Sequence, residues 1–531
     1  MRAKRTMALI MVAVGMSGCG WKKIGWEWHG GTGGGFAGKA PTAPSPAPDR
    51  RGAPGLRAAK APAVFTHGVA SGEAGSTSVL LWTRTAEEAR LRVQVSADPD
   101  FPKGETVERG VATKSARDFT AAVRVTRLDP ATAYWYRFVD PKGETASEIG
   151  RFRTAPLPSV AADLRFVFTG DTDGTRIDGA PAFNDFQVLD RAREEDPDFF
   201  LYLGDTIYTD SPMGLLNGVP AAETLDDYRA KYRENRGYAA LRGLLGATST
   251  LAVWDDHEVV DNFAGTTADP DRLAAGRQAF EEYMPVARHS RKTGYFRHFR
   301  WGTDAEFFVL DERSFRSANA SVIAGNDPLP TLPAEIRTAV GLGLAADPPA
   351  GTLEALADPA RTMLGARQKE IFKSLLLASD ARFKFVVNEV AVAELFADPY
   401  DRWEGYRAER DEILQFVVDN RIANVVFLTG DMHTNAVLDV RVSVLQGSEV
   451  VAKEIIAGPA AEFTLSQEID LLYGEGASAA FIGLIEGLNP PVFADHDAYG
   501  YALVEVDSGA GTATVTLKDA AGAVLYAITL P

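Results

Sequence analysis

The sequence is poor in cysteine and histidine. Cys19 is the single cysteine among 531 residues. One cysteine forms no intramolecular disulfide and no cysteine-cluster metal site, so disulfide-stapled folds are excluded. With seven histidines, a closed structural zinc site is not expected either. The length exceeds that of one ordinary domain and predicts two to four domains.

The sequence also lacks an excess of basic residues. Lys and Arg number 55 against 72 Asp and Glu, which gives a formal net charge of −17. A protein that coats nucleic acid needs a basic face, so that class is excluded. Small phosphate substrates remain possible, because bound cations reverse the local sign of the charge. A content of 46% hydrophobic and 24% charged residues is typical of globular proteins.

Long apolar runs are missing as well. Basic residues at positions 2–5 precede an apolar run over 7–16, which is too short to span a bilayer. This pattern predicts a signal peptide over 1–18. Two small residues stand just before Cys19 and resemble a lipoprotein signal, in which that cysteine is lipidated; plain secretion with cleavage nearby is the alternative. We expect an exported protein, anchored to the cell envelope through Cys19 and facing the periplasm or the outside.

The next two segments differ sharply in composition. Residues 19–61 are rich in Gly and Pro and have almost no aliphatic residues, so we predict a tether that cannot bury a core. Residues 62–155 predict a small β-sandwich, because short strand-like runs alternate with turn signals. Those runs lie at 79–82, 91–95, 121–125 and 133–138.

From residue 160 to 531 apolar strands alternate with helical patterns. Such alternation predicts a buried α/β sheet. The predicted strands lie at 164–168, 199–203, 250–254, 306–310, 383–387 and 424–428, with further strands at 499–506, 513–517 and 524–530. The predicted helices lie at 183–195, 225–245, 367–378 and 406–420. Gly- and Pro-rich stretches at 210–220 and 317–362 break the alternation, and a structureless loop as long as the second usually covers a site or is partly disordered.

Aspartates follow several of these strands directly. The carboxyl edge of an open α/β sheet is where ligands bind, so these side chains are expected to share one pocket. They are Asp171, Asp205, Asp256 and Asp431. Like charges at close range raise one another's pKa, and cations relieve that cost.

Tyr208 and two histidines, His257 and His433, lie on the same loops. Carboxylate and phenolate oxygens suit Ca²⁺, Mg²⁺, Mn²⁺ or Fe³⁺. Two or three adjacent cations that share a bridging carboxylate fit this residue set best. Such a centre activates a hydroxide and clamps a phosphoryl group during in-line attack.

The order of the motifs resembles PhoD-like alkaline phosphatases and phosphodiesterases, a branch of the calcineurin-like metallophosphoesterases. The resemblance spans roughly residues 64 to 506. Its motifs are Gly68-Val69-Ala70-Ser71-Gly72, Leu81-Trp82-Thr83-Arg84, Gly204-Asp205-Thr206-Ile207-Tyr208, Trp254-Asp255-Asp256-His257-Glu258, Leu310-Asp311-Glu312-Arg313 and Thr429-Gly430-Asp431-Met432-His433. It implies a four-layer α/β/β/α catalytic domain behind a fibronectin-like β-sandwich, with Fe³⁺ and Ca²⁺ as metals.

The resemblance also implies roles for single residues. Asp205 would bridge metals and Tyr208 would bind iron, while His257 stands at the catalytic histidine. The remaining metal-binding positions are Asp256, Asn388, Asp431 and His433. The family usually has an iron-ligating cysteine where this chain has Asp171. A hard oxygen there leaves Mn²⁺, Mg²⁺ or Ca²⁺ open beside iron.

Other polar residues have less specific surroundings. Arg277, on a predicted helix, is either a contact to substrate phosphate or a solvated helix residue. Glu258 and Asp261 are expected to orient ligands, and Asp173 replaces a histidine of the wider superfamily's first motif. Arg288, Arg313 and Arg316 are equally compatible with internal ion pairs and substrate clamps.

The sequence thus predicts a metal-dependent hydrolase of phosphate mono- or diesters. The alternatives are a phospholipase D-type phosphodiesterase that acts on lipids, or an inactive surface binding protein of the same fold. Intact metal and catalytic positions speak against the inactive form, whereas the missing cysteine speaks for it. The oligomeric state is not predicted.

Overall fold

The computed structural model describes residues 64–339 and 344–531. The predicted signal peptide, the tether over 19–61 and the lipidation site Cys19 lie outside the described residues and stay predictions. The described chain contains two large β-sheets, a second sheet of the N-terminal sandwich and a two-stranded ribbon.

The first large sheet has nine strands in the order β22-β21-β20-β8-β11-β12-β1-β2-β5. Its centre is parallel: β11 pairs with β8 on one side and with β12 on the other. The strands are β8 (Leu164–Thr169), β11 (Phe199–Leu203), β12 (Ser249–Val253), β20 (Gly500–Asp507), β21 (Thr512–Asp519), β22 (Val524–Leu530), β1 (Phe65–Gly72), β2 (Ser78–Thr85) and β5 (Thr120–Thr126).

The second large sheet has seven strands in the order β13-β14-β15-β16-β18-β17-β19. The run β14-β15-β16-β18 is parallel. The strands are β13 (Arg297–Trp301), β14 (Ala305–Val309), β15 (Phe383–Asn388), β16 (Val425–Thr429), β18 (Val450–Ile456), β17 (Asn435–Arg441) and β19 (Phe493–Asp495).

A core of aromatic rings holds the two large sheets face to face. Phe166 of the first sheet meets Phe307 and Phe385 of the second with ring centroids 5.3 and 5.4 Å apart, in the edge-to-face geometry that aromatic pairs prefer. Because both faces of these central strands are covered, β11 is apolar throughout and β14 is apolar except for Glu306.

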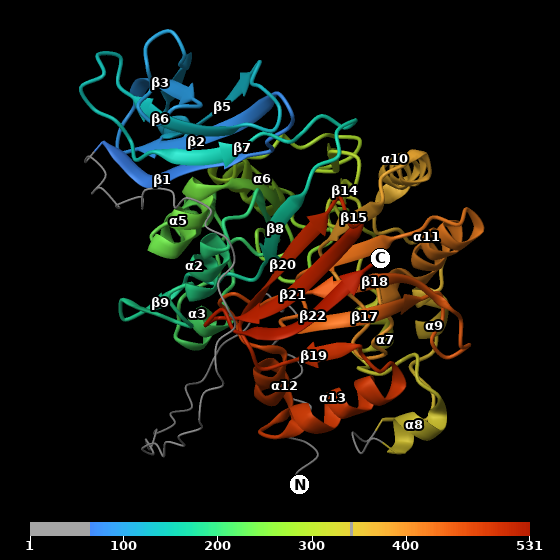
Figure 1. The fold of residues 1–531 in the computed structure, drawn as a ribbon. Helices are drawn as coiled ribbons and strands as arrows, with labels where there is room; N and C mark the ends of the chain where they lie inside the picture. The colour runs from blue at the N-terminus through green and yellow to red at the C-terminus, as the bar shows by residue number, and fades with distance from the viewer. Residues whose placement is uncertain (1–63, 340–343) are drawn as a thin grey trace, which may run out of the picture. The chain divides into compact units, whose positions relative to one another are not determined.

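Helices cover the outer face of each sheet (Figure 1). On the first sheet lie α2 (Gln187–Glu194), α4 (Leu225–Asn235), α5 (Ala239–Ala247) and α6 (Pro270–Tyr283). On the second lie α10 (Gly365–Ala378) and α11 (Arg407–Asp419). The predicted α/β/β/α order of layers is confirmed.

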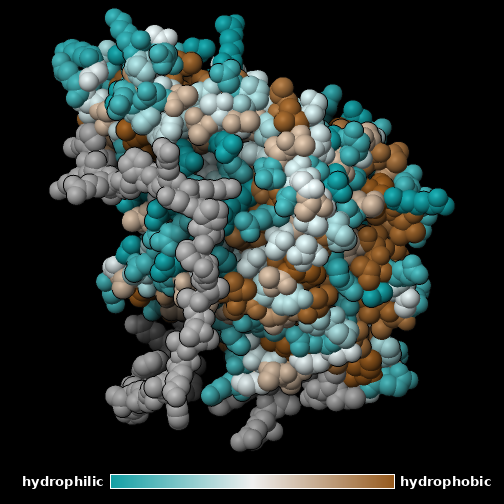
Figure 2. Space-filling view, viewed as in Figure 1, coloured by the Kyte–Doolittle hydropathy of each residue, from teal (hydrophilic) through white to brown (hydrophobic). Residues whose placement is uncertain are grey.

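The N-terminal sandwich is joined to the first large sheet. Its other sheet has the order β4-β3-β6-β7, with β3 (Ala89–Ser96), β4 (Val107–Thr113), β6 (Ala133–Val139) and β7 (Gly150–Arg153). The end of β1 pairs in parallel with β12, Ser71 opposite Ser249, so the first large sheet continues into the sandwich. Figure 2 shows the sandwich as mostly hydrophilic at its outer surface.

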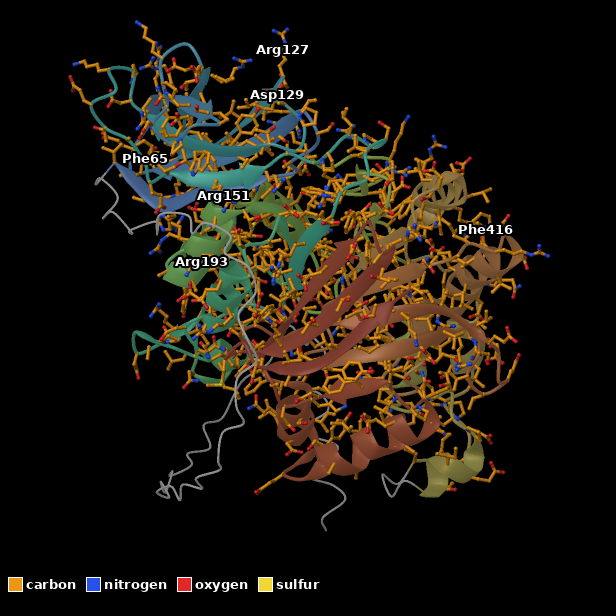
Figure 3. The ribbon with its side chains drawn as sticks, in the orientation of Figure 1. Phe65, Arg127, Asp129, Arg151, Arg193 and Phe416 are labelled. Atoms are coloured by element: carbon orange, nitrogen blue, oxygen red, sulfur yellow. The ribbon has the colours of Figure 1, made fainter. Side chains whose placement is uncertain are left out.

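Side chains fasten the same boundary. The indole of Trp82, fully buried, donates from Nε1 to the Glu282 carbonyl at 2.7 Å, and the Arg236 guanidinium lies 4.2 Å from its ring centroid. At the surface, Arg151 on β7, labelled in Figure 3, pairs with Asp196 after α2 at 2.8 Å. The exposed pair contributes little, whereas the buried indole contributes much.

Two predicted segments differ from the structure. The helix expected over 225–245 is two helices, because α4 ends at Asn235 and the Arg236-Gly237-Tyr238 turn precedes α5. The prediction of a structureless loop over 317–362 is wrong: it holds α7 (Ser321–Ala324), α8 (Ala334–Ala339) and α9 (Thr352–Leu356). Similarly, α3 (Pro212–Leu216) lies within 210–220. These helices are too short for a periodic pattern to be seen.

The joined sheet generates a prediction about stability. Trp82→Ala should lower the free energy of unfolding by about 3–5 kcal/mol, as for other large-to-small core changes. Trp135→Ala, on the half-buried face of β6, is the matched control and should cost clearly less. Urea denaturation followed by circular dichroism measures both. Equal losses for the two variants would contradict a stabilising role for the sandwich boundary.

Candidate metal centre

Glycines bring three strand ends close together. Each of Asp171, Asp205 and Asp431 directly follows a glycine. A Cβ at Gly170 would lie 2.6 Å from the Leu203 carbonyl oxygen, and one at Gly430 would lie 2.5 Å from the same oxygen. Side chains at these two positions are therefore excluded. The ends of β8 and β16, which belong to different sheets, can approach the end of β11 for this reason.

The three aspartates share an uncommon backbone conformation. Their φ angles are 58°, 46° and 61°, in the left-handed region that side chains other than Asn and Asp rarely adopt. His433 has φ 49°. Such residues cost about 1–3 kcal/mol each and persist where the surrounding structure holds them. Here the left-handed turn directs each carboxylate away from its strand toward a common pocket.

Two groups of side chains at these ends have the spacing of a metal site. Asp171, Asp205 and His433 form one group, and Asp205, Asp256 and His257 form the other. Within each group the ligand atoms lie within 4.8 Å of one another. Asp205 belongs to both groups, which is the arrangement that a bridging carboxylate needs.

Unpartnered atoms show that these residues fit cations. Both carboxylate oxygens of Asp171 and Oδ1 of Asp256 are buried without a hydrogen-bond partner. Buried polar atoms are rarely left without one, since each such atom costs about 1–3 kcal/mol. Hard oxygen donors with one imidazole nitrogen match Ca²⁺, Mg²⁺, Mn²⁺ and Fe³⁺.

The electrostatics point the same way. Burial, and after it neighbouring carboxylates, raise the pKa of Asp171 and of Asp431 well above the usual range. Burial also raises the pKa of Asp205 well above that range. The charged forms of three carboxylates are thus unfavourable in the protein alone, and cations would stabilise them.

The two histidines have opposite environments. Burial, followed by the nearby His257, lowers the pKa of His433 to about 4, so this imidazole is neutral and able to bind a metal. Burial also disfavours the charged form of His257, but Asp210, Asp256 and Asp205 outweigh it and raise the pKa of His257 well above its ordinary value. One imidazole is set up as a ligand and the other as a proton carrier.

Asp210 fixes the ring of His257. His257 Nδ1 lies 2.6 Å from Asp210 Oδ1, while Asp210 Oδ2 accepts from the Asp261 N–H at 2.8 Å. The tautomer with a proton on Nδ1 donates to Asp210 and leaves Nε2 on the pocket side, 3.9 Å from Asp256 Oδ1. Sequence reasoning missed Asp210, although its place five residues after Asp205 on the same loop was a usable signal.

Tyr208 lies between the two histidines. Its ring stacks on His257 with centroids 4.2 Å apart, and its hydroxyl is 3.0 Å from His433 Nε2. Burial, then the charges of Asp205 and Asp171, raise the pKa of Tyr208 well above 10. A phenolate at this position requires a cation beside it, so the predicted iron-binding role depends on metal occupancy.

Arginines supply positive charge at one side of the pocket. Arg313 is fully buried and contacts Asp255, Asp256 and Asp401, with its Nε 2.5 Å from Asp255 Oδ1. Arg316 contacts Asp401 at 2.5 Å. Both arginines are therefore internal ion-pair partners. A third acidic group consists of Asp256, Asp401 and Asp431. The guanidinium groups of Arg313 and Arg316 already balance its negative charge.

Asp401 was also missed from the sequence, and no strand-end pattern marks it. It stands in the irregular segment after β15. Carboxylates of Glu312, Glu454 and Glu404 hold that segment by accepting backbone N–H bonds from Val390, Val392, Ala393, Leu395 and Phe396.

Two acidic residues near the ligands are structural. Glu258 accepts from the Thr206 N–H at 2.6 Å and from the Asp255 N–H at 2.8 Å, and so ties together the loops that carry Asp205 and Asp256. The orienting role expected of Glu258 agrees with these bonds. Asp173 accepts from the Ser211 hydroxyl and from the Thr175 N–H, so it fixes a turn.

Two predicted site residues are not brought to the pocket. The Asn388 carboxamide accepts from Trp403 Nε1 at 3.0 Å and donates to Val390 and Thr429. Arg277 packs over the Trp254 ring at 5.9 Å and does not line the cavity at the metal residues. Their predicted roles stay predictions without a supporting contact.

The sequence and the fold are similar to those of known phosphatases. A "PhoD-like phosphatase" family model matches residues 178–515, and the model of its N-terminal domain matches residues 50–156. Alkaline phosphatase D of Bacillus subtilis (strain 168) is 28% identical over 440 residues, 74% of this chain and 70% of that protein. Purple acid phosphatase 15 of Arabidopsis thaliana is 30% identical over 177 residues, 30% of this chain and 28% of that protein.

Solved structures share the fold. A structure of PhoD superposes with a TM-score of 0.70 at 23% identity and covers 89% of this chain and 94% of its own. Purple acid phosphatase PPD1 from yellow lupin (Lupinus luteus) seeds superposes with a TM-score of 0.56 at 12% identity. The superposition covers 88% of this chain and 75% of the lupin protein. The family resemblance predicted from the motifs is confirmed. Because the family model covers more than half of the chain, the protein belongs to the PhoD-like phosphatase family and is a hydrolase of phosphate esters.

Proposed function

We propose that the protein is an exported alkaline phosphatase that hydrolyses phosphate mono- or diesters with two or more bound metal ions. The observation that carries this proposal is the pair of groups that share Asp205; the second keeps the carboxylates of Asp205 and Asp256 as ligands when its third member, His257, serves as the proton donor. Cations bound there would activate the attacking water for in-line displacement and neutralise the phosphoryl charge.

The protein's own groups perform the proton transfer. Asp210 holds the Nδ1–H of His257 and keeps the imidazole protonated by its negative charge. His257 then donates the Nε2 proton to the leaving oxygen as the bond from that oxygen to phosphorus breaks. The alcohol leaves neutral, and His257 regains a proton from solvent before the next cycle.

The metals are proposed from the donor set. By family resemblance they are Fe³⁺ with Ca²⁺. Asp171 offers oxygen where that family has a thiolate, so Mn²⁺ or Mg²⁺ also fit the group of Asp171, Asp205 and His433. Lipid anchorage through Cys19 is proposed from the sequence pattern alone.

Metal removal is the first test of this function. Exhaustive chelation should abolish hydrolysis of 4-nitrophenyl phosphate and of bis(4-nitrophenyl) phosphate, because buried carboxylates need cations to stay charged together. Elemental analysis must confirm metal-free protein, since Fe³⁺ dissociates slowly. Full activity of protein shown to be metal-free would contradict the proposal.

The proton-transfer step predicts a graded pair of variants. His257→Ala should lower kcat by about 10²–10⁴-fold, and Asp210→Asn by about 10–10²-fold, because the amide no longer holds the imidazole charged and in place. The loss should be larger for a phenyl ester than for a 4-nitrophenyl ester, whose leaving group needs no proton.

The controls for this pair are His298→Ala and Asp190→Asn, which change the same residue types at sites remote from the pocket. Both should retain wild-type kcat. Equal kcat for His257→Ala and wild type with both esters would refute the assigned role.

Asp171 separates metal binding from turn formation. Asp171→Ala should lose metal content together with kcat, because both its oxygens are buried without a hydrogen-bond partner and it belongs to one group of possible metal ligands with Asp205 and His433. Asp173→Ala should keep the metal and lose about 0.5–2 kcal/mol of stability, since it breaks the bonds from the Thr175 N–H and from the hydroxyl of Ser211, which precedes α3. Elemental analysis and thermal denaturation compare the two. An iron-loaded wild type should also lack a thiolate charge-transfer band. Normal metal content in Asp171→Ala would rule out its role as a ligand.

A further inference from the structure

The cavity at the metal residues has a single arginine or lysine among its described lining residues, Arg402. The cavity has a volume of about 240 Å³ and reaches from Asp205 and His257 to helices α12 (Leu465–Tyr473) and α13 (Ala477–Leu488). Eight carboxylate side chains line it as well. A phosphate ester is itself an anion, so these carboxylates oppose its entry wherever cations do not balance them. Arg402 is the one permanent positive charge that the lining side chains offer to such a ligand.

The neighbours of Arg402 hold its backbone in place at the cavity. Arg402 is extended, with φ −86° and ψ 176°. Asp401, the residue before it, accepts from Arg313 Nη1 at 2.8 Å. Trp403, the residue after it, donates from Nε1 to Glu312 at 2.7 Å. Because both neighbours are fixed by buried partners, little conformational freedom of this segment is lost when a ligand binds.

Arg402 lacks the close ion pairs of a purely structural arginine. The Nε of Arg313 lies 2.5 Å from an oxygen of Asp255. Among the described ion pairs of Arg402, the nearest carboxylate is that of Glu404, at 3.7 Å, which is too long for a hydrogen bond. Both oxygens of Glu404 already accept backbone N–H groups, at 2.9 and 3.0 Å. The charge of Arg402 is therefore still available to a ligand.

Most N–H groups of the Arg402 guanidinium also lack a protein acceptor. Among the described residues, only its Nη2 donates to one, the Ala397 carbonyl. Its Nε is buried without a hydrogen-bond partner, and the whole side chain is 12% exposed. Buried polar atoms are rarely left unpaired, so these N–H groups indicate an acceptor that a ligand brings into the cavity.

The position of Arg402 suits the oxygens of the phosphate that do not react. In the in-line reaction proposed above, the attacking and leaving oxygens lie on opposite sides of phosphorus, and His257 serves the leaving oxygen. The three other oxygens are all terminal in a monoester, whereas one of them bears an organic group in a diester. Arg402 adjoins Asp401, whose carboxylate lies within 4.8 Å of those of Asp256 and Asp431. Its guanidinium therefore stands at the edge of the metal centre, where these three oxygens lie.

We infer, on the basis of the proposed function, that Arg402 binds a charged terminal oxygen of the phosphate and makes the enzyme prefer monoesters to diesters. The guanidinium gains more from a dianion than from a monoanion, and a charged terminal oxygen is a better acceptor than an ester oxygen. His257 has the same role with both ester classes, so Arg402 affects the choice of substrate and not the proton transfer.

Two 4-nitrophenyl esters test this inference on the metal-loaded enzyme. At about pH 9, 4-nitrophenyl phosphate and methyl 4-nitrophenyl phosphate share one leaving group and differ by a methyl group and one negative charge. Arg402→Gln should lower kcat/KM for the monoester by about 10–10²-fold, the loss of one hydrogen bond to a charged group, and for the diester by about threefold or less. The monoester-to-diester ratio of kcat/KM should fall by about tenfold.

Three further variants separate charge from folding. Arg407→Gln removes an arginine of the same segment that contacts Glu394 at 3.6 Å outside this cavity, and it should leave the ratio unchanged. Arg402→Met keeps the length of the side chain and should show the same fall as Arg402→Gln, which guards against a folding defect of one variant. Arg402→Lys keeps the charge and should hold the ratio within about threefold of wild type. A loss in Arg402→Lys as large as in Arg402→Gln would contradict the role of the charge.

Titration calorimetry with two unreactive anions gives a readout independent of turnover. Arg402→Gln should raise the Kd of inorganic phosphate by about tenfold and keep that of dimethylphosphinate, a monoanion, within about twofold of wild type.

The outcomes distinguish the inference from the proposed function. An unchanged monoester-to-diester ratio in Arg402→Gln, or an equal fall of kcat/KM for both esters, would overturn the inference and leave the proposed function standing. Hydrolysis of neither ester by the metal-loaded wild type would instead overturn the proposed function, whatever the Kd of phosphate.

Discussion

Repulsion between buried carboxylates constrains the pocket and the loops around it. Asp171, Asp205 and Asp256 are each nearly inaccessible to solvent, and Asp431 lies against them. Arg313 neutralises the side that Asp255 and Asp256 occupy. No arginine or lysine pairs with Asp171 or Asp205 among the described ion pairs, so that side depends on external cations. Arg313 is thus a permanent counter-charge for Asp255 and Asp256, whereas the carboxylates of Asp171 and Asp205 are left for metal ions.

Close backbone packing brings these carboxylates together. Glycines on two different sheets contact one carbonyl, that of Leu203, and the following aspartates take left-handed turns into the pocket. The two histidines of this pocket have opposite pKa shifts. Neighbouring carboxylates raise the pKa of His257, whereas burial and the nearby imidazole of His257 lower the pKa of His433. Acid and ligand are therefore distinguished by surroundings rather than by residue type.

The layers and most candidate ligands could be predicted from the sequence for a local reason. A parallel strand buried on both faces is a continuous apolar run, and the residue after it must lie at the sheet edge. Asp171, Asp205 and Asp431 follow such runs directly, and the structure brings them together. Asp401 follows no strand, and part of its segment is held by Glu312 and Glu454, which lie far away in the sequence. No local pattern contains that information.

Other features escaped prediction because they are non-local pairings. The contact of β1 with β12 joins residues separated by about 180 positions, and nothing in the β1 sequence specifies it. Asn388 stands at the end of its strand, where a metal ligand is expected, but its carboxamide oxygen accepts a hydrogen bond from Trp403 Nε1. Sequence patterns predict what a residue is suited to do, and tertiary contacts decide whether it is free to do so.

Asp205 is proposed to link two metal ions in one buried pocket. Anomalous diffraction from crystals of the active holoenzyme, recorded on both sides of the absorption edges of the metals found by elemental analysis, tests it most directly. We predict at least two anomalous peaks, one beside Asp171 and His433 and one beside Asp256, each in contact with a different oxygen of Asp205. A fully active enzyme with a single metal ion, or with metals that do not contact Asp205, would contradict the account.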